Sequence, residues 1–352
     1  MAVKWGVIGA GGIADRRTIP EMVRVADNAQ LVALMDVSKD AVERVAKKYG
    51  VSATYTDEEE LLKNPEVQAV YIATPQNVHH RQVLLAAKYG KDIFCEKPMA
   101  TSLKDADEML AACDKAGVKL GFDYMMRFNI HNQKIKALVD AGQLGRPVMG
   151  RAELTCWYPP METAWRQKRA IAYGGSLIDM GSHCLDVLEW IFSTRIVEVF
   201  AFHDSLVHPY NVEDTSTTIL RFENGAHGIV DNYFNVPDQA AKNFLEVYGT
   251  QGSILASGTI GQDPTGTFTS NLVSAGLGYS ANQVRDAGGF RSETHQYEGV
   301  PMYGTMVRLF SEAIERGGEL PVPAEVGYHN LKVILAIYES ARGGKPVRIK
   351  YE

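Results

Sequence analysis

The sequence predicts an α/β domain with a doubly wound parallel sheet, followed by an α+β domain with a large, open, mainly antiparallel sheet. A glycine-rich turn at residues 9–14 directly follows the first expected strand. Expected strands and helices then alternate, which is typical of βαβ units. Later strands follow one another with short turns, as in antiparallel sheets. Because 352 residues exceed one ordinary core, we expect domains at 1–124 and 125–352.

Composition narrows the class of protein. The 36 basic and 42 acidic residues leave a net charge of −6, which argues against nucleic-acid binding. No apolar run approaches the roughly 18 residues of a membrane span, so we expect no membrane association. Four cysteines without a CxxC pair indicate reduced thiols in a cytoplasmic protein, not a disulfide framework or zinc site.

The turn after the first strand, residues 3–8, reads GAGGIA and fits the G-x-G-x-x-G/A fingerprint of a Rossmann dinucleotide-binding domain. Gly9 permits the tight turn, and Gly11 lets a pyrophosphate approach the backbone. Ala14 keeps helix and strand close. The helix N-terminus offers free N–H groups to the phosphates. We therefore expect Gly9, Gly11, Gly12 and Ile13 at the cofactor.

Asp36 ends the second expected strand, residues 29–35. A carboxylate there can accept both ribose hydroxyls of NAD and would repel the extra phosphate of NADP. NAD is therefore the favoured cofactor, although residues 37–39 leave room for NADP. The alternative is an aspartate that only caps a turn with Ser38.

Two further strand ends carry polar residues. The remaining expected elements of this domain are helices at 40–49, 57–62, 78–88 and 103–116 and strands at 67–73, 92–95 and 119–122. Thr74-Pro75-Gln76-Asn77 follows one of these strands, and Glu96-Lys97-Pro98 follows the next. Ligands of parallel sheets sit beyond such carboxyl ends. Lys97 there can donate to a substrate oxygen; the alternative is an exposed Glu-Lys turn.

The stretch at residues 174–192, GGSLIDMGSHCLDVLEWIF, predicts a helix with two unlike faces. At 100° per residue, Asp179, His183 and Asp186 share one stripe with Trp190, opposite an apolar arc. Asp and His beside a glycine pair favour a pocket wall over a solvated face. Ser176-x-x-Asp179 is also a capping-box pattern, so a capped surface helix is the alternative.

The second domain is expected to contain consecutive strands. The expected elements are a helix at 130–141, strands at 148–158, 196–202, 214–222, 227–234 and 244–248, helices at 300–317 and 324–342, and a strand at 345–350. Residues 257–288, rich in Gly, Ser and Thr, predict a long loop or irregular hairpin, either a lid or interaction segment or a disordered loop.

These motifs together carry a resemblance over nearly the whole chain. GAGGIA at 9–14, ATPQNVHH at 73–80, CEKPMATS at 95–102 and GGSLIDMGSHCLD at 174–186 occur in this order. The sequence resembles the glucose-fructose oxidoreductase/inositol dehydrogenase/MocA (Gfo/Idh/MocA) family of NAD(P)-dependent oxidoreductases. The resemblance implies hydride transfer between the nicotinamide and a secondary alcohol or carbonyl of a sugar, sugar derivative or cyclitol. It also implies a homodimer or homotetramer formed through the C-terminal sheet.

Hydride transfer needs a base for the hydroxyl proton, and His183 is the candidate in the polar stripe. Lys97 would donate to the reacting oxygen, and Asp179 would orient the imidazole or hold a second hydroxyl. This set coincides with the family's Lys/Asp/His set. Expected cofactor contacts beyond the glycine loop and Asp36 are Thr74, Pro75, Asn77, His79, Glu96, Lys97, Trp165 and Arg166. Expected substrate contacts are Lys97, Arg127, Trp157, Tyr158, Asp179, His183 and Tyr233, with Asp186 a structural partner.

Three alternatives stay open. Asp179, His183 and Asp186 share a face and are conceivable metal ligands, but such a site leaves Lys97 unexplained and lacks a Cys or second His, so we expect no metal. A family branch hydrolyses glycosides through transient oxidation with bound NAD. A non-catalytic NAD-binding sensor is the third.

Overall fold

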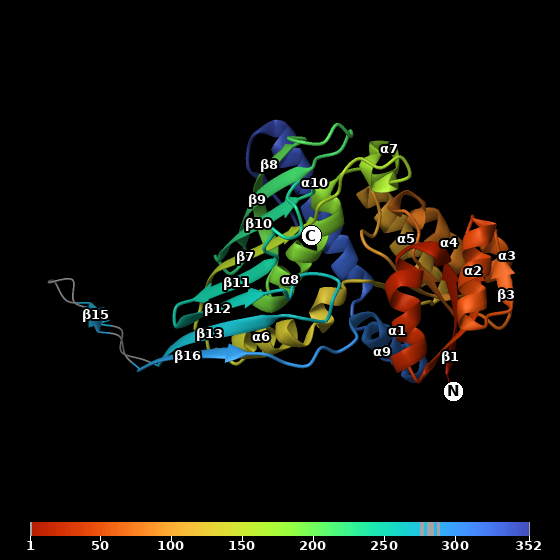
Figure 1. Ribbon diagram of the computed structural model, residues 1–352, viewed down its shortest axis with the longest axis horizontal. Coiled ribbons are helices and arrows are strands. Elements are labelled where there is room, and N and C mark those ends of the chain that lie inside the picture. Colours follow the sequence, from red (N-terminus) through yellow and green to blue (C-terminus); the bar gives the residue numbers. More distant parts are fainter. Residues whose placement is uncertain (1, 275–277, 280–284, 287–288, 352) are drawn as a thin grey trace. The chain divides into compact units, whose positions relative to one another are not determined.

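The computed structural model describes residues 2–274, 278–279, 285–286 and 289–351. Its chain forms two compact units (Figure 1). Unit 1 contains Met1–Met125, Lys168–Tyr173 and Pro301–Lys332, and unit 2 contains Met126–Gln167, Gly174–Val300 and Val333–Glu352. The predicted second domain, 125–352, thus differs from unit 2, because residues 301–332 group with the N-terminal part of the chain.

Unit 1 is built on a six-stranded parallel sheet, as predicted. Its strands are β1 (Val3–Ile8), β2 (Ala29–Met35), β3 (Ala53–Tyr55), β4 (Ala69–Ile72), β5 (Asp92–Cys95) and β6 (Leu120–Phe122). The order β3-β2-β1-β4-β5-β6 is that of a doubly wound dinucleotide-binding sheet. The order reverses between β1 and β4, which is where ligands bind in such sheets. Strand β3, only three residues long, was not predicted.

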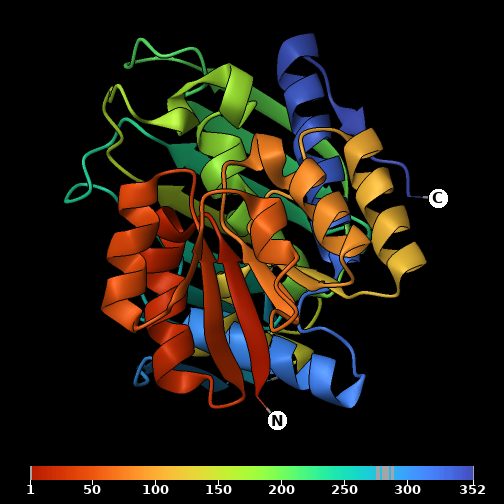
Figure 2. The same cartoon turned by 90° about the vertical axis from the view of Figure 1, so that its right-hand side faces the viewer.

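Helices flank this sheet (Figure 2). They are a wide π-type segment at Ala10–Thr18 that continues into α1 (Ile19–Val25), then α2 (Lys39–Tyr49), α3 (Glu58–Leu62), α4 (His79–Lys88) and α5 (Leu103–Ala116). Ser38, Asp57 and Ser102 start α2, α3 and α5 by accepting backbone N–H groups. Gly50 and Gly117, both in the left-handed conformation, end α2 and α5.

Helix α9 (Met302–Arg316) belongs to unit 1 because it packs closely on α1 and β1. A Cβ added to Gly304 would lie 2.8 Å from the carbonyl oxygen of Glu21, so the two helices meet at backbone distance. The indole N–H of Trp5, a fully buried residue of β1, donates to the Ser311 hydroxyl at 3.0 Å. These contacts explain why α9 belongs to unit 1, although the predicted boundary placed it in the second domain.

Unit 2 contains a nine-stranded sheet. Its strands are β7 (Pro147–Thr155), β8 (Ile196–Asp204), β9 (Thr215–Phe222), β10 (His227–Tyr233), β11 (Phe244–Gly249), β12 (Gly252–Ser257), β13 (Thr267–Ser274), β16 (Gly289–His295) and β17 (Val347–Arg348), in the order β16-β13-β12-β11-β7-β10-β9-β8-β17. Neighbours are antiparallel except β7 and β10. The mainly antiparallel prediction is confirmed.

The glycine-rich segment at 257–288 forms part of a hairpin. Strands β13 and β16 pair in register, and a short pair, β14 (Gly278–Tyr279) and β15 (Arg285–Asp286), lies between them in the chain. The sequence predicts either a long loop or an irregular hairpin here, and residues 267–274 form one strand of the hairpin. The remainder of that prediction, at 275–277, 280–284 and 287–288, lies outside the described residues.

One face of the nine-stranded sheet is covered by helix α8 (Ser182–Phe192). A Cβ on Gly150 of β7 would lie 2.9 Å from both Leu188 and Phe192, so the helix rests directly on this strand. Further helices are α6 (Ile130–Asp140), the short α7 (Arg169–Ala172) and the closing α10 (Ala324–Gly343). Among the described residues, no helix is long and apolar enough to span a bilayer.

Candidate functional site: a dinucleotide loop and a polar helix

The glycine loop lies against the end of β4. Gly9 has φ +90°, a conformation that favours glycine, and a Cβ there would lie 2.8 Å from the Ala73 carbonyl oxygen. A Cβ on Gly12 would meet no heavy atom within 4 Å. The loop is therefore closed on its strand side and open beside Gly12. A dinucleotide pyrophosphate fits such a cradle, because the space beside Gly12 is open.

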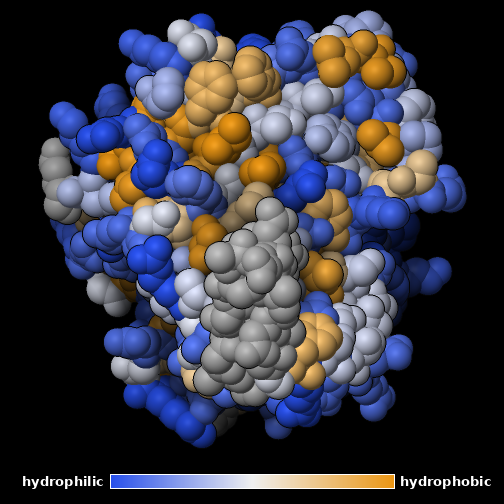
Figure 3. Space-filling model, turned by 90° about the vertical axis from the view of Figure 1, so that its left-hand side faces the viewer, coloured by the Kyte–Doolittle hydropathy of each residue, from blue (hydrophilic) through white to orange (hydrophobic). Residues whose placement is uncertain are grey.

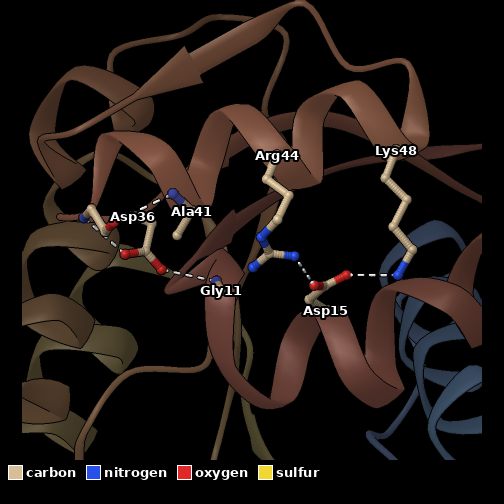
Figure 4. A network of polar contacts seen from close by, with 7 residues as sticks. Gly11, Asp15, Asp36, Ala41, Arg44 and Lys48 are labelled. Atoms are coloured by element: carbon tan, nitrogen blue, oxygen red, sulfur yellow. Dashed lines mark hydrogen bonds and ion pairs between the residues drawn. The ribbon is translucent and has the colours of Figure 1, made fainter. Parts of the chain in front are cut away.

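Asp36 contacts this loop directly (Figure 4). Its Oδ2 accepts from Gly11 N at 2.8 Å, and its Oδ1 accepts from Ser38 N at 2.9 Å. The turn-capping interaction with Ser38 is thus present, but one oxygen also binds the glycine loop. The carboxylate is held at the side of the loop where the resemblance implies the adenosine ribose.

Two cations of α2 are engaged beside the loop (Figure 4). Buried Asp15 accepts from Arg44 Nη1 at 2.6 Å and from Lys48 Nζ at 2.8 Å. Burial alone would raise the pKa of Asp15, but the hydrogen bonds from Lys48 and Arg44 lower it overall. Both cations therefore have a carboxylate partner inside the unit.

His79 joins the loops that follow β4 and β5. Its Nε2 lies 2.9 Å from the Thr74 carbonyl oxygen and its Nδ1 lies 3.0 Å from the Pro98 carbonyl oxygen. The ring is fully buried, and burial lowers the pKa of His79. Both ring nitrogens face backbone carbonyls, so the structure does not support the predicted contact of His79 with the cofactor. The ring lies instead between the loops that follow β4 and β5.

The other predicted residues of unit 1 sit at these two strand ends. Strands β4 and β5 are neighbours, with Ile72 opposite Cys95, so the segment 74–77 and the Glu96-Lys97-Pro98 turn emerge side by side. The Lys97–Pro98 peptide bond is cis. Glu96 Oε1 accepts from the buried Tyr71 hydroxyl at 2.6 Å. Thr74, Pro75, Asn77 and Lys97 therefore lie where ligands of parallel sheets bind, while Glu96 reaches into the interior.

In unit 2 the polar helix starts with a wide turn. Residues Leu177–Gly181 are π-type and precede α8, so the predicted regular helix from Ser176 is wrong over its first turn. Asp179 lies in the wide turn and His183 lies in α8, so the two are not related by the regular 100° per residue that predicts a common stripe. His183 is only 7% exposed and Asp186 only 2%, so this polar stripe is not a solvated face.

Glu213 begins this helix instead of the predicted capping serine. Its Oε1 accepts from Gly175 N at 2.8 Å, from Leu177 N at 3.2 Å and from the Tyr338 hydroxyl at 2.8 Å. In the described part of the chain, the buried Ser176 hydroxyl has no hydrogen-bond partner. Sequence reasoning missed Glu213, whose signal is the acidic pair at 213–214 before β9.

The glycine pair permits this arrangement. A Cβ on Gly174 would lie 1.7 Å from the Tyr338 hydroxyl oxygen, and a Cβ on Gly175 would lie 1.9 Å from the Glu213 carbonyl oxygen. Neither site leaves room for a side chain, so both glycines are required for the helix to start here.

Asp179 pairs with Arg166. Arg166 Nε donates to Asp179 Oδ1 at 3.1 Å, and the guanidinium lies 4.4 Å from the Trp165 ring centroid. Burial raises the pKa of Tyr158, which also feels Arg166 and Asp179. The structure thus brings Tyr158, Trp165, Arg166 and Asp179 into one cluster of unit 2.

Arg127 is committed to Asp186. Its Nη2 donates to Asp186 Oδ1 at 2.6 Å and its Nε to Oδ2 at 2.9 Å, in a buried bidentate pair. Burial raises the pKa of Asp186, and Arg127 offsets only part of this rise. Arg127 was predicted to contact the substrate, but in the structure it forms an ion pair that fixes α8. Asp186 is its partner in this pair, in agreement with the structural role predicted for it.

Two predicted substrate residues lie elsewhere in unit 2. Asn232 faces Cys184 of α8, at 3.7 Å, so the next residue, Tyr233, points to the opposite face of the sheet. Its hydroxyl there is near Thr217 and Asp231. Tyr233 therefore lies on the face of the sheet away from α8, and its predicted contact with the substrate stays a prediction. Trp157 packs edge-on against His208 with ring centroids 5.1 Å apart and is 43% exposed.

The metal alternative gains no support from these contacts, because Asp179 and Asp186 each bind an arginine. Within the described residues, the trio whose ligand atoms lie within 4.8 Å of one another is a different one, His80, Asp105 and Glu108 on α4 and α5.

Comparisons with known proteins decide the family. Residues 3–124 match the oxidoreductase family with an NAD-binding Rossmann fold, and residues 132–255 match the Gfo/Idh/MocA C-terminal domain. The chain belongs to the Gfo/Idh/MocA oxidoreductase family. The resemblance predicted from the motifs is therefore confirmed, and an NAD-binding oxidoreductase fold is established.

Relatives of the chain include sugar and inositol enzymes. It is 30% identical to a 1,5-anhydro-D-fructose reductase of Ensifer adhaerens, over 99% of this chain and 98% of that one. It is 33% identical to a myo-inositol 2-dehydrogenase of Thermotoga maritima, over 71% and 74%. The solved structure of an aldose-aldose oxidoreductase from Caulobacter crescentus, complexed with glycerol, is 27% identical with a TM-score of 0.87, over 99% and 100%.

Replacement of Glu213 tests the start of the polar helix. Glu213→Ala leaves two buried N–H groups and a tyrosine hydroxyl without their acceptor, so we expect a loss of about 2–4 kcal/mol in unfolding free energy. Urea unfolding measures it, with exposed Glu298→Ala as the control, expected within about 0.5 kcal/mol of wild type. Equal midpoints for both variants would contradict the role given to Glu213.

Proposed function

We propose that the protein is an NAD(P)-dependent dehydrogenase or reductase acting on a CH–OH group of a sugar, sugar derivative or cyclitol. The observation that carries the proposal is the dinucleotide cradle at Gly9–Gly12 with Asp36 bound to it, in a chain of this oxidoreductase family. The sugar and inositol enzymes among its relatives support the substrate class.

We assign the chemistry to three residues. His183, at the buried start of α8, takes the proton of the substrate hydroxyl or returns it in reduction. Lys97 donates a hydrogen bond to the reacting oxygen and so supports its alkoxide character. Asp179, held by Arg166, orients the substrate or the imidazole. A nicotinamide bound at the glycine loop supplies the hydride acceptor or donor.

We further propose that the neighbouring residues shape the two binding sites. Thr74, Pro75, Asn77 and the glycine loop would line the cofactor. Tyr158 and the Trp165-Arg166 pair would surround the substrate, because Arg166 and Tyr158 cluster with Asp179. Planar rings and a guanidinium suit a polyhydroxylated ring, which presents apolar faces and many hydroxyls.

Substitution of Lys97 and His183 tests the reaction. With NAD and a panel of aldoses, inositols, sugar acids and glycosides, we expect NADH absorbance to grow with at least one polyol. Lys97→Met and His183→Ala should lower kcat about 10²–10⁴-fold while cofactor binding persists. Exposed Lys104→Met and His227→Ala serve as controls. Sugar release without NADH would indicate the hydrolase, and activity unchanged by both substitutions would favour a sensor.

Cofactor preference is tested at Asp36, which supports NAD as the preferred cofactor. Asp36→Ser removes a charged acceptor for the ribose hydroxyls and a charge that repels the 2′-phosphate. We expect kcat/KM for NAD to fall about 10–100-fold and the value for NADP to rise. Asp40→Ser, an exposed acid in the next helix, is the matched control. An unchanged NAD/NADP ratio in Asp36→Ser would refute the assignment.

We also propose that copies of the chain associate through the outer face of the nine-stranded sheet. Phe202, Ile219 and Leu255 on β8, β9 and β12 point away from α8 and are 63%, 52% and 40% exposed. Hydrophobic side chains gather among polar ones on the face drawn in Figure 3. An apolar patch of this kind is typical of an association surface. The cytoplasmic location stays a prediction.

Light scattering tests this association. We expect wild type to have the mass of a dimer or tetramer and Ile219→Glu, which buries a charge in the interface, to be a monomer. Leu206→Glu, exposed in the segment after β8, is the control and should keep the wild-type mass. A monomeric wild-type protein would rule the proposal out.

A further inference from the structure

In unit 1, Glu96 and Asp123 directly follow the neighbouring strands β5 and β6, at the same level along the two strands. Strands β5 and β6 are parallel with Cys95 opposite Phe122, so Glu96 and Asp123 are the next residues on each strand. Asp123 N donates to the Cys95 carbonyl oxygen at 2.9 Å, which extends the ladder to this point. Residues opposite one another on parallel strands point to the same face, so the two carboxyl groups face each other.

The surroundings of Asp123 offer it little compensation beyond the backbone N–H of Met125, which lowers its pKa only in small part. Its side chain is 1% exposed, and among the described residues neither carboxyl oxygen has a hydrogen-bond donor in good geometry. Glu96 is better placed, because the Tyr71 hydroxyl donates to it at 2.6 Å while the Thr18 hydroxyl donates to Tyr71 at 3.0 Å. Two ionised carboxylates have no hydrogen to share, so a bond between Glu96 and Asp123 requires one proton.

The charges packed around the pair favour this proton. Burial raises the pKa of Asp123 well above its usual range, Glu96 raises it further, and Lys97 offsets only part of the rise. Tyr71 on β4, Cys95 on β5 and Tyr303 on α9 are the further titratable groups near the pair. Burial raises the pKa of each of the three, so they stay neutral.

We infer that Asp123 and Glu96 share one proton and together form a buried positioning element for Lys97. With the proton, Asp123 donates to Glu96, which Tyr71 holds from its other side. Glu96 precedes Lys97 in the chain, so a fixed Glu96 fixes the backbone from which Lys97 extends. The shared proton does not depend on the proposed function. The effect on Lys97 does rest on the proposed function, because that function assigns Lys97 its role.

Infrared difference spectroscopy tests the shared proton. At about pH 8, where isolated carboxyls are ionised, wild type minus Asp123→Asn should show a carboxylic-acid C=O band. Asp92→Asn, at a half-buried aspartate at the start of β5 that accepts from Lys119 N, is the control and should show no such band. Absence of the band from the Asp123→Asn difference would overturn the inference.

The pH dependence of stability gives a second readout. A carboxyl whose pKa is raised by folding stabilises the protein fully below its unfolded value, about 4, and loses this contribution as pH rises toward the folded value. Asp123→Asn keeps a donor to Glu96 without a titrating group. We expect its unfolding midpoint to fall less than that of wild type between acid and neutral pH. Parallel curves would overturn the inference.

Kinetics tests the link to Lys97. Asp123→Ala removes the donor and should lower kcat several-fold with KM for NAD unchanged, and Asp123→Asn should restore most of it. Unchanged kcat in Asp123→Ala would overturn the positioning role. If no variant and no wild-type protein turns over any polyol, the proposed function fails, while the infrared band and the stability curves still decide the shared proton.

Discussion

Close contact between neighbouring strand ends is the constraint on which unit 1 depends. The glycine loop can approach β4 only because Gly9 has no side chain to meet the Ala73 carbonyl oxygen. His79 then joins the ends of β4 and β5 by facing a carbonyl oxygen of each loop. A neutral imidazole has one N–H, so it donates to one of these carbonyl oxygens, and the buried ring lies between the two loops. Together with the hydrogen bonds of Thr74 to Gln82 and of Glu96 to Tyr71, the ring gives the segments around Thr74 and Lys97 defined positions.

In unit 2, a carboxylate side chain accepts hydrogen bonds from buried backbone N–H groups at the start of a helix. A helix that begins in the interior leaves N–H groups without partners, and here Glu213 accepts from two of them. A side chain from the strand region can reach that position only past Gly174 and Gly175. Arg127 anchors the same helix about two turns further on, through Asp186. His183 lies between these two anchors, and its place follows from both.

Local patterns predicted the parts of the fold that depend on short stretches of chain. The glycine fingerprint, the strand ending at Asp36 and the parallel sheet all follow from residues close in sequence. The wide turn at Leu177–Gly181 and the pairing of Arg127 with Asp186 depend on residues at least 36 positions away, and the face occupied by Tyr233 depends on strand register. A helical projection contains no information about such partners.

Buried acids show why partners decide the role of a residue. Asp15 and Asp186 each have a cation, and Glu213 has three donors, so each can be buried as an anion and serve as an anchor. Asp123 has no ion pair and no donor in good geometry among the described residues, Lys97 compensates its charge only in part, and its neighbour is another carboxyl group. A proton shared by the two carboxyl groups removes the remaining charge. Buried carboxyl groups therefore act as fixed anchors at three places and as a titrating group at the fourth, and that fourth place directly adjoins Lys97.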